Sequence, residues 1–409
     1  MKTKNLNRSC LALAVSLAIG SATVIAQETT TENDVTATES STTSGLGFER
    51  IVVTGAVSRN QSVMQSSVSV SSLTFEDIDV TSPRSTAEIF RMLPGVRSES
   101  TGGEGNANIA VRGLPVAAGG AKFLTLQEDG LPVLQFGDIA FGNADIFVRA
   151  DSTMARLDVI RGGSASTAAS NSPGGIINYI SKTGEHQGGS IAVTSGINYD
   201  QFRTDFEFGG DINNDMRFHF GGFVRQGEGV RDPGYQGERG YQIKANVTKE
   251  FNAGYVRVYA KHLNDRAASY MPMPMYADGS SVPGYDAQKD TLQSVYLSQT
   301  VRLNGDNQIS RGDVRDGMNP KVDSFGIEAQ FDLDENWTFA TLTYAVGPQA
   351  GQEYTAADAM RIHTFDVEIN DFGSIVNDLK LARSFGDVDV TFGYYMADQT
   401  ISMSWLWTS

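Results

Sequence analysis

Residue types that carry most enzyme and metal chemistry are thinly spread in this sequence. The single cysteine, Cys10, lies close to the N-terminus. The histidines lack the close spacing of metal ligands and are scattered along the chain: His186, His219, His262 and His363. No nucleophile, base and orienting residue form a recognisable set. We therefore expect no enzyme activity, no catalytic residue, no metal and no cofactor.

Two further kinds of ligand chemistry are also excluded. The glycine-rich run Gly162-Gly163-Ser164 lacks the Lys-Ser/Thr ending with which a phosphate-binding loop contacts phosphate and magnesium. The chain has 48 acidic and 32 basic residues, and its formal net charge is −16. So acidic a chain is not expected to bind nucleic acid.

The first 26 residues have the anatomy of an export signal, with a basic start, an apolar stretch at 11–20 and small residues before Gln27. Its removal takes Cys10 away, and a cysteine-free chain suits an oxidising periplasm. The apolar stretch is shorter than the ~20 residues that a membrane-spanning helix needs. No later stretch is long enough, so any membrane span must consist of strands.

The next two segments differ in composition. Residues 27–57 open with a run rich in Thr, Ser and Glu that cannot bury enough apolar surface to become ordered, and we predict a flexible leader. Residues 58–184 have a globular composition. A helix is expected over 84–93, ended by Pro94-Gly95, with short strands around 109–112, 123–128 and 157–161.

Residues 185–409 alternate between apolar and polar side chains. Over 241–248, Tyr, Ile, Ala and Val alternate with Gln, Lys, Asn and Thr, which places the two kinds on opposite faces of a strand. Periodicity alone does not distinguish a membrane barrel from a soluble sandwich. Short turns near 211–215, 251–254, 332–336 and 385–387 alternate with long connections near 227–240, 265–322 and 346–377. Such asymmetry is typical of outer-membrane barrels.

We predict about nine antiparallel strands in this region. An open sheet of this kind would leave unpaired backbone groups facing lipid, at a cost of several kcal/mol each. We therefore expect a fragment or a truncated gene product.

Three motifs, together with the order of the segments described above, carry a resemblance to a known family. Ile51-Val52-Val53-Thr54-Gly55 resembles a TonB box, and Arg112-Gly113 lies in an early plug signature. The strongest match is the gap-free run 154–182, in which Asp158 stands where the family usually has Glu. Over roughly residues 49–397 the chain resembles a TonB-dependent outer-membrane receptor.

The resemblance implies an α+β plug domain followed by an incomplete antiparallel transmembrane β-barrel in the outer membrane of a Gram-negative bacterium. It implies capture of a scarce or bulky nutrient, such as a ferric siderophore, another metal chelate or an oligosaccharide, and its import into the periplasm. The implied partners are TonB with its inner-membrane energising complex, the nutrient ligand, outer-membrane lipid and the barrel-assembly machinery.

The resemblance also assigns roles to residues. The segment Ile51, Val52, Val53, Thr54 and Gly55 is expected to dock to TonB by strand addition, the alternative being a first strand of the plug. A second set is expected to anchor the plug, because its paired charges could bind complementary charges on the barrel wall: Arg112, Gly113, Arg156, Asp158, Arg161, Gly162, Gly174 and Gly175.

The longest exterior connection holds a Met-Pro run and nearby tyrosines, which suit adaptable ligand contacts: Met271, Met273, Met275, Tyr276 and Tyr285. A loop stiffened by proline, without ligand contact, is an equal alternative.

Three rival functions stay open. A passive porin or adhesin would need neither a plug nor a TonB box. A signal transducer would carry a folded domain before the TonB box, for which residues 27–48 are too short and too polar. A soluble β-sandwich would not explain the loop asymmetry.

Overall fold

A computed structural model of the protein describes residues 69–100, 103–105, 107–115, 123–135, 138–139, 142–162, 169–270, 275–284, 286, 289–291, 300–302, 309–311, 315, 317–334, 337–346, 352–358, 363–386 and 388–408. The export signal, the leader and the TonB-box segment expected from the sequence lie outside these residues. None of the described helices is long and apolar enough to cross a membrane.

Residues 69–184, called the plug below, contain a five-stranded sheet. Its strands, in spatial order, are β1 (Ser69–Thr74), β8 (Met154–Arg161), β9 (Gly175–Ser181), β4 (Leu124–Glu128) and β5 (Leu131–Pro132). All neighbours are antiparallel except β4 and β9, which are parallel. Among the described residues, β1 lies at one edge of this sheet and pairs with β8 alone.

Shorter elements complete the plug. Strands β2 (Val96–Ser100) and β3 (Ala107–Val111) form one antiparallel pair, and β6 (Asp138–Ile139) and β7 (Gly142–Asn143) form another. The 3-10 helix η2 (Ala144–Phe147) follows β7.

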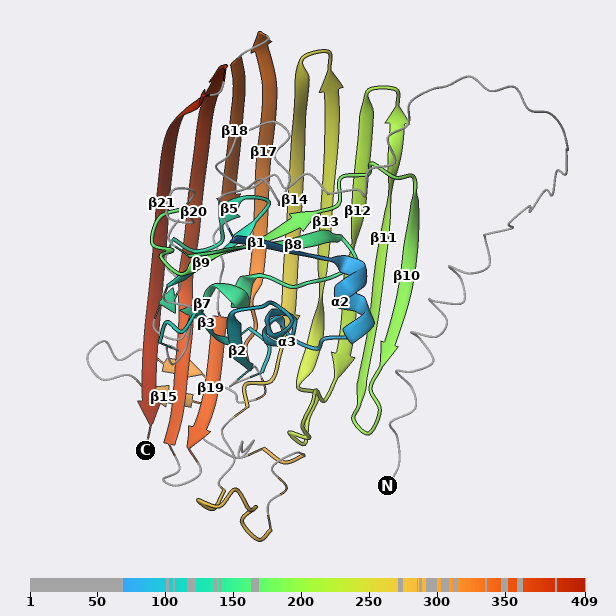
Figure 1. Ribbon diagram of the computed structural model, residues 1–409. Coiled ribbons are helices and arrows are strands. Elements are labelled where there is room, and N and C mark those ends of the chain that lie inside the picture. Colours follow the sequence, from blue (N-terminus) through green and yellow to red (C-terminus); the bar gives the residue numbers. More distant parts are fainter. Residues whose placement is uncertain are drawn as a thin grey trace, which may run out of the picture. The chain divides into compact units, whose positions relative to one another are not determined.

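Two short helices cover part of the plug (Figure 1). Helix α3 (Thr86–Arg91) confirms the helix expected over 84–93, and the hydroxyl of Ser85 caps it by accepting from the amide of Glu88. Helix α2 (Phe75–Thr81) was not expected. It begins at a reciprocal capping box between Thr74 and Asp77, and only Ile78 of this helix is buried, so it has no apolar periodicity to reveal it.

The plug core is continuous with side chains from the larger sheet. Leu157 and Val159 of β8 are fully buried, since β8 lies inside the plug sheet. Phe147 of η2 stacks on Phe372, with ring centroids 4.9 Å apart. Each such buried side chain contributes roughly 1.5–3 kcal/mol.

The larger sheet, called the barrel sheet below, is antiparallel and has ten strands. Figure 1 shows its strands side by side from green to red. They are β10 (Gly188–Ser195), β11 (Gln201–Asn213), β12 (Met216–Gly227), β13 (Glu238–Phe251), β14 (Gly254–Arg266), β17 (Lys321–Asp334), β18 (Trp337–Val346), β19 (Gln352–Asp358), β20 (His363–Phe385) and β21 (Val388–Thr408). Strands β15 (Thr300–Arg302) and β16 (Ile309–Arg311) pair separately between β14 and β17.

The sheet has one strand more than the sequence predicts. The connection expected over 346–377 instead contains β19 and much of β20. The 23-residue β20 is long enough to pair with β19 over 363–369 and with β18 over 374–383 along the same edge. The short turns agree with the prediction, because two residues separate β11 from β12, β13 from β14, β17 from β18 and β20 from β21.

The expected alternation of faces is present in β13. Gln242 and Thr248 are fully buried, whereas Ile243 and Val247 are 37% and 39% exposed. Gln242 contacts Asp151 of the plug, so side chains of the first kind lie on the plug side of the sheet and those of the second kind on the opposite side. We call these the inner and outer faces of the barrel sheet.

Candidate functional site

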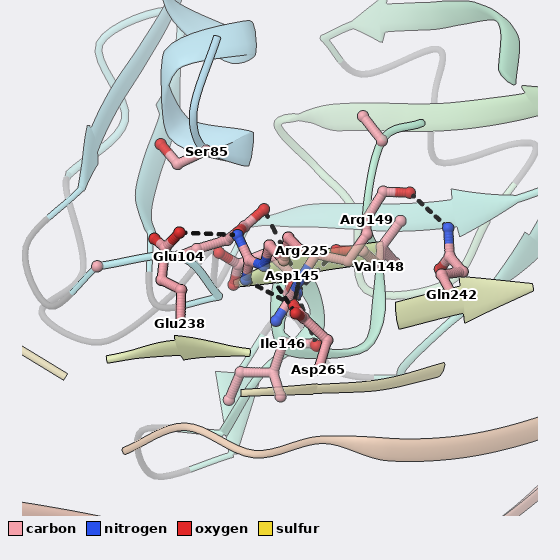
Figure 2. A network of polar contacts seen from close by, with 12 residues as sticks. Ser85, Glu104, Asp145, Ile146, Val148, Arg149, Arg225, Glu238, Gln242 and Asp265 are labelled. Carbon is pink, nitrogen blue, oxygen red and sulfur yellow. Dashed lines mark hydrogen bonds and ion pairs between the residues drawn. The ribbon is translucent and has the colours of Figure 1, made fainter. Parts of the chain in front are cut away.

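The plug and the inner face of the barrel sheet are joined by a buried set of charges, which we call the arginine network (Figure 2). Arg225 of β12 donates to Asp265 of β14 from Nε to Oδ1 at 2.7 Å and from Nη2 to Oδ2 at 2.6 Å. Arg149 of the plug donates from Nε to Oδ2 of Asp265 at 2.7 Å. Arg225 also pairs with Glu104 of the plug, and its Nη1 lies 3.8 Å from Glu238. All five side chains are at least nine-tenths buried.

Strand register and one glycine bring this network together. Arg225 and Asp265 lie on either side of Gly240 of β13, which is the Cα partner of both. A Cβ on Gly240 would lie 2.7 Å from Oδ1 of Asp265. Because Gly240 has no side chain, Arg225 can reach across β13 and form its two parallel hydrogen bonds.

Arg149 is held in place by its own helix. Its Nη1 donates to the carbonyl oxygens of Asp145, Ile146 and Val148 at 3.1, 3.0 and 3.0 Å. These bonds satisfy carbonyl groups that the end of η2 leaves free. They hold the guanidinium in position for Asp265, and its planar group loses little side-chain entropy for each hydrogen bond formed.

Asp145 is a buried carboxyl beside this network. Its Oδ2 accepts from the amide of Ala107 at 2.9 Å, and its Oδ1 has no hydrogen-bond partner among the described residues. Burial raises the pKa of Asp145 to about 7, although the Ala107 amide and Arg149 favour the ionised form. Glu104, a nearby carboxylate, adds to the rise.

A second set of charges, called the lysine site below, lies at the end of β4. Glu128 accepts from Lys244 of β13 at 2.8 Å and from Lys261 of β14 at 2.5 Å. Burial alone would raise the pKa of Glu128, but the two ammonium groups outweigh it and lower the pKa to about 2. Each lysine has a further plug contact, Lys244 to Oγ of Ser181 at 2.9 Å and Lys261 to the carbonyl oxygen of Phe147 at 3.0 Å.

Uncharged groups extend the interface between these two sets. The amide of Gln242 donates to Oδ2 of Asp151 at 2.7 Å, and that of Asn246 donates to the carbonyl oxygen of Lys182 at 2.8 Å. Both amides belong to the inner face of β13. Polar contacts, which are specific in direction and distance, thus bind the plug in addition to the apolar core that it shares with the barrel sheet.

The charged residues expected to anchor the plug make contacts within the plug. Arg156 pairs with Asp158 at 3.1 Å, and Asp158 accepts from the hydroxyl of Ser72 at 2.7 Å. Arg161 donates to the hydroxyl of Ser71 at 2.7 Å. These bonds connect β8 to β1 and do not reach the barrel sheet, so the anchoring role of these residues stays a prediction.

The remaining members of that set shape the plug backbone. Arg112 and Gly113 have φ of +51° and +76°, which is the tight turn expected there. A Cβ on Gly174 or Gly175 would lie 2.8 or 2.3 Å from a backbone carbonyl oxygen, and a Cβ on Gly162 would lie 2.8 Å from Nη1 of Arg112. Glycine is therefore needed at these positions.

The structure describes only some of the other expected site residues. Met275 and Tyr276 are each 53% exposed. Met271, Met273 and Tyr285, like the docking segment Ile51 to Gly55, lie outside the described residues. In the part of the chain that the structure describes, no group of three or more His, Cys, Asp or Glu side chains could hold a metal ion.

The sequence did not predict which residues join the plug to the barrel sheet. Partners lie far apart along the chain, 121 residues for Arg225 and Glu104 and 133 for Lys261 and Glu128. A usable signal existed, since charged residues at inner-face positions of predicted strands face the plug: Arg225, Lys244, Lys261 and Asp265.

Comparison with known proteins follows the same division of the chain. Residues 62–176 match the model of the TonB-dependent receptor plug domain. The vitamin B12 transporter BtuB of Photobacterium profundum is 33% identical over 145 residues, which cover 35% of this chain and 22% of that protein. The ferric enterobactin receptor PirA of Pseudomonas aeruginosa is 26% identical over 228 residues, 46% of this chain and 30% of that protein.

The fold match extends over the barrel sheet as well. The crystal structure of the ferric yersiniabactin uptake receptor FyuA from Yersinia pestis aligns with 85% of this chain and 51% of its own, with a TM-score of 0.59 and 16% identity. Residues 62–176 of this chain are thus a TonB-dependent receptor plug domain, and the chain as a whole is similar to TonB-dependent receptors. Its fold is a plug domain followed by an antiparallel barrel sheet that is not closed. The chain spans 22% and 30% of the length of the two curated relatives and 51% of that of FyuA.

The arginine network and the lysine site are contacts between the plug and the barrel sheet. The proteins to which this chain is similar are named as transporters and receptors. The division into domains, with boundaries at residues 26, 57 and 184, stays a prediction.

Proposed function

We propose that this protein is an outer-membrane receptor of a Gram-negative bacterium that binds a nutrient at the cell surface and imports it into the periplasm with energy supplied through TonB. The observation that carries the proposal is the buried, polar attachment of the plug to the barrel wall. Outer-membrane lipid and the barrel-assembly machinery are partners that such a barrel requires.

A polar interface suits a plug that must be closed at rest and movable under load. Breaking one buried pair by removing a partner costs about 3–5 kcal/mol, because a charge is left buried without its counterpart. When the whole plug moves, however, water enters and solvates both partners. The attachment between Arg149 and Asp265, with its N–O distance of 2.7 Å, is therefore firm in the closed state without making the plug immovable.

The plug sheet offers a route for the applied force. The expected docking segment at 51–55 precedes β1, which, in the part of the chain that the structure describes, lies at a sheet edge and pairs with β8 alone. A pull from the N-terminal side loads β1 first. Ser71 and Ser72 fasten β1 to Arg161 and Asp158 of β8, so these bonds help to carry the load from β1 to β8 until they break.

The nutrient is a ferric siderophore, another metal chelate or an oligosaccharide. The names of the relatives, a vitamin B12 transporter and a ferric enterobactin receptor, support a bulky chelate. The loop that contains Met271, Met273, Met275, Tyr276 and Tyr285 is the candidate contact, since Met and Tyr adapt to large ligands.

A proline substitution tests the TonB coupling. Val52→Pro removes a backbone donor and disturbs strand addition. In cells that express the protein, energised uptake from a panel of ferric siderophores, cobalamin and oligosaccharides should fall to background, while binding of the same ligand at the cell surface is kept. Val35→Pro, in the leader, is the matched control and should transport normally.

Unchanged uptake in Val52→Pro at equal expression would contradict the coupling. That result is what a passive porin or adhesin predicts, because diffusion through a pore or adhesion needs no docking segment. The plug match over residues 62–176 argues against that alternative.

A further inference from the structure

The outer face of the barrel sheet carries a basic cluster at the end where its strands run into long connections. It consists of Arg239 of β13, Arg266 of β14 and Lys321 of β17, and we call it the basic rim. Connections on this side span residues 228–237 and 267–320, whereas the opposite ends of these strands have two-residue turns. In outer-membrane barrels the long connections lie on the extracellular side.

Strand register places the three basic side chains close together. Arg239 and Arg266 are Cα partners. Lys321 is the Cα partner of Asn264, two positions before Arg266 on the same face, and such diagonal neighbours lie about 7–8 Å apart. One polyvalent anion can therefore contact all three.

These cations are not neutralised by the protein. No hydrogen bond or ion pair engages the side chains of Arg239 and Lys321 within the described residues, and both residues are exposed. Arg266 donates from Nη2 to the carbonyl oxygen of Gln236 at 3.0 Å, and its buried Nε has no partner in the described part of the chain.

Nearby acidic groups are engaged elsewhere. Asp323, on the same face, pairs with His262 at 2.5 Å. Glu238 and Asp265, next to Arg239 and Arg266 in sequence, point to the inner face and belong to the arginine network. The basic rim is thus a local positive surface on a chain whose formal net charge is −16.

An apolar band begins directly beside the basic rim. On the same strands and the same face, Ile243, Val258, Phe325 and Ile327 are exposed by 37%, 51%, 64% and 51%. Such a band faces hydrocarbon in a membrane barrel. The basic rim then lies at the level of the lipid headgroups, where its charges are in water and its aliphatic stems border the acyl chains.

We infer that the basic rim binds the phosphate groups of an anionic glycolipid in the outer leaflet of the outer membrane. The inference rests on the proposed outer-membrane location. Arginine donates parallel hydrogen bonds to phosphate oxygens, and lysine adds a point charge. The adjoining apolar band accepts the acyl chains, so one lipid satisfies both surfaces, whereas free phosphate satisfies only the first.

The test measures lipid binding by the purified chain in nonionic detergent micelles. Fluorescently labelled, bisphosphorylated lipid A is titrated with protein and followed by anisotropy. The variant Arg239→Gln/Arg266→Gln/Lys321→Gln should bind at least about tenfold more weakly, since each charge-assisted hydrogen bond is worth more than a tenfold change in affinity. Monophosphorylated lipid A should bind the wild-type chain several-fold more weakly, and inorganic phosphate should not compete.

The matched control is Lys249→Gln. Lys249 lies on the same strand and face as Arg239, at the opposite end, and is paired with Asp215; its loss should leave lipid binding unchanged. Equal affinity of the triple variant and the wild-type chain would overturn the inference, as would an equal loss in Lys249→Gln or full competition by inorganic phosphate.

The assay contains neither TonB nor nutrient, so its outcome is independent of transport. Val52→Pro should bind lipid A as the wild-type chain does, even where it abolishes uptake. A failure of the proposed import and a failure of the lipid site therefore give different results.

Discussion

The arginine network and the lysine site hold the same plug to neighbouring strands, but they differ in how charge is balanced. In the arginine network two guanidinium groups, Arg149 and Arg225, meet a single carboxylate, Asp265, with Glu104 and Glu238 close by. In the lysine site two ammonium groups share the single carboxylate of Glu128. The arginine network has more carboxylates than cations, and its guanidinium groups are planar. The lysine site has more cations than carboxylates, and its lysine side chains are flexible.

This difference determines what each site can tolerate. Guanidinium groups do not lose their protons, so Arg149 and Arg225 stay charged whatever happens to Asp265. A buried lysine can become neutral or swing toward water. The arginine network is therefore the more fragile of the two toward loss of its shared carboxylate.

The largest effect is expected from Asp265→Asn. It removes the carboxylate that the two buried guanidinium groups share, with Glu104 and Glu238 as their remaining carboxylates, and should destabilise plug closure by about 3–5 kcal/mol. Maleimide labelling of Ala87→Cys, a buried reporter on α3, in a Cys10→Ser background measures plug opening. The labelling rate should rise about a hundredfold or more.

Asp323→Asn is the matched control for that experiment. Asp323 has the same side chain and lies on β17, next to β14, but its pair with His262 is on the outer face and its side chain is 59% exposed. Exposed pairs are worth about 0–1 kcal/mol, so labelling should change little. A similar rise in both variants would show that the arginine network does not hold the plug.

A second, smaller effect separates the two sites by pH. The folded pKa of Glu128 is lowered to about 2 from 4.5, so its contribution is complete above pH 4.5 and is lost as the pH falls toward 2. The folded pKa of Asp145 is raised to about 7 from 3.8, so its contribution is complete below 3.8 and is lost as the pH rises toward 7. Each limb should amount to about 3–4 kcal/mol, since one pKa unit corresponds to about 1.4 kcal/mol.

Plug stability should therefore be highest near the middle of the acid range. Urea titrations from pH 3 to 8, followed by the mobility of a nitroxide on Val80→Cys in exposed helix α2, would show both limbs. Glu128→Gln should remove the acid limb and Asp145→Asn the limb toward neutral pH, so each variant controls for the other. If Glu128→Gln kept the acid limb, the assignment of that limb to Glu128 would be wrong. If Asp145→Asn kept the limb toward neutral pH, the assignment to Asp145 would be wrong.

The sequence predicted periodic elements well and paired side chains poorly. Alternation over residues 241–248 gave β13 and its two faces, and Pro94-Gly95 gave the end of α3. Both features are local, so neighbouring residues determine them. The contact of Arg149 with Asp265 spans 116 residues and depends on strand register and on the missing side chain of Gly240, neither of which any spacing records.

The charged motif in β8 shows the same limit, because its partners lie elsewhere in the chain. Family resemblance singled out Arg156, Asp158 and Arg161, but it did not state their partners. The structure places two of those partners, Ser71 and Ser72, on β1. A motif can therefore locate a site correctly while the direction of its contacts stays unknown until the neighbouring strand is placed.

The smallest effect is expected from Arg161→Ala. It removes the hydrogen bond to Ser71 at 2.7 Å and the bond to the carbonyl oxygen of Pro94, at a cost of about 1–2 kcal/mol. Hydrogen exchange should accelerate over β1, roughly tenfold, and little over η2, because Arg149 still holds η2 to the barrel wall. Ser71→Ala should reproduce most of the change and add little to it in the double variant.

A ligand-contact role for Arg161 predicts the reverse, a large loss of nutrient affinity with normal exchange over β1. An anchoring role at the barrel wall predicts faster exchange over η2 as well, so one exchange experiment run beside an equilibrium binding titration separates all three roles.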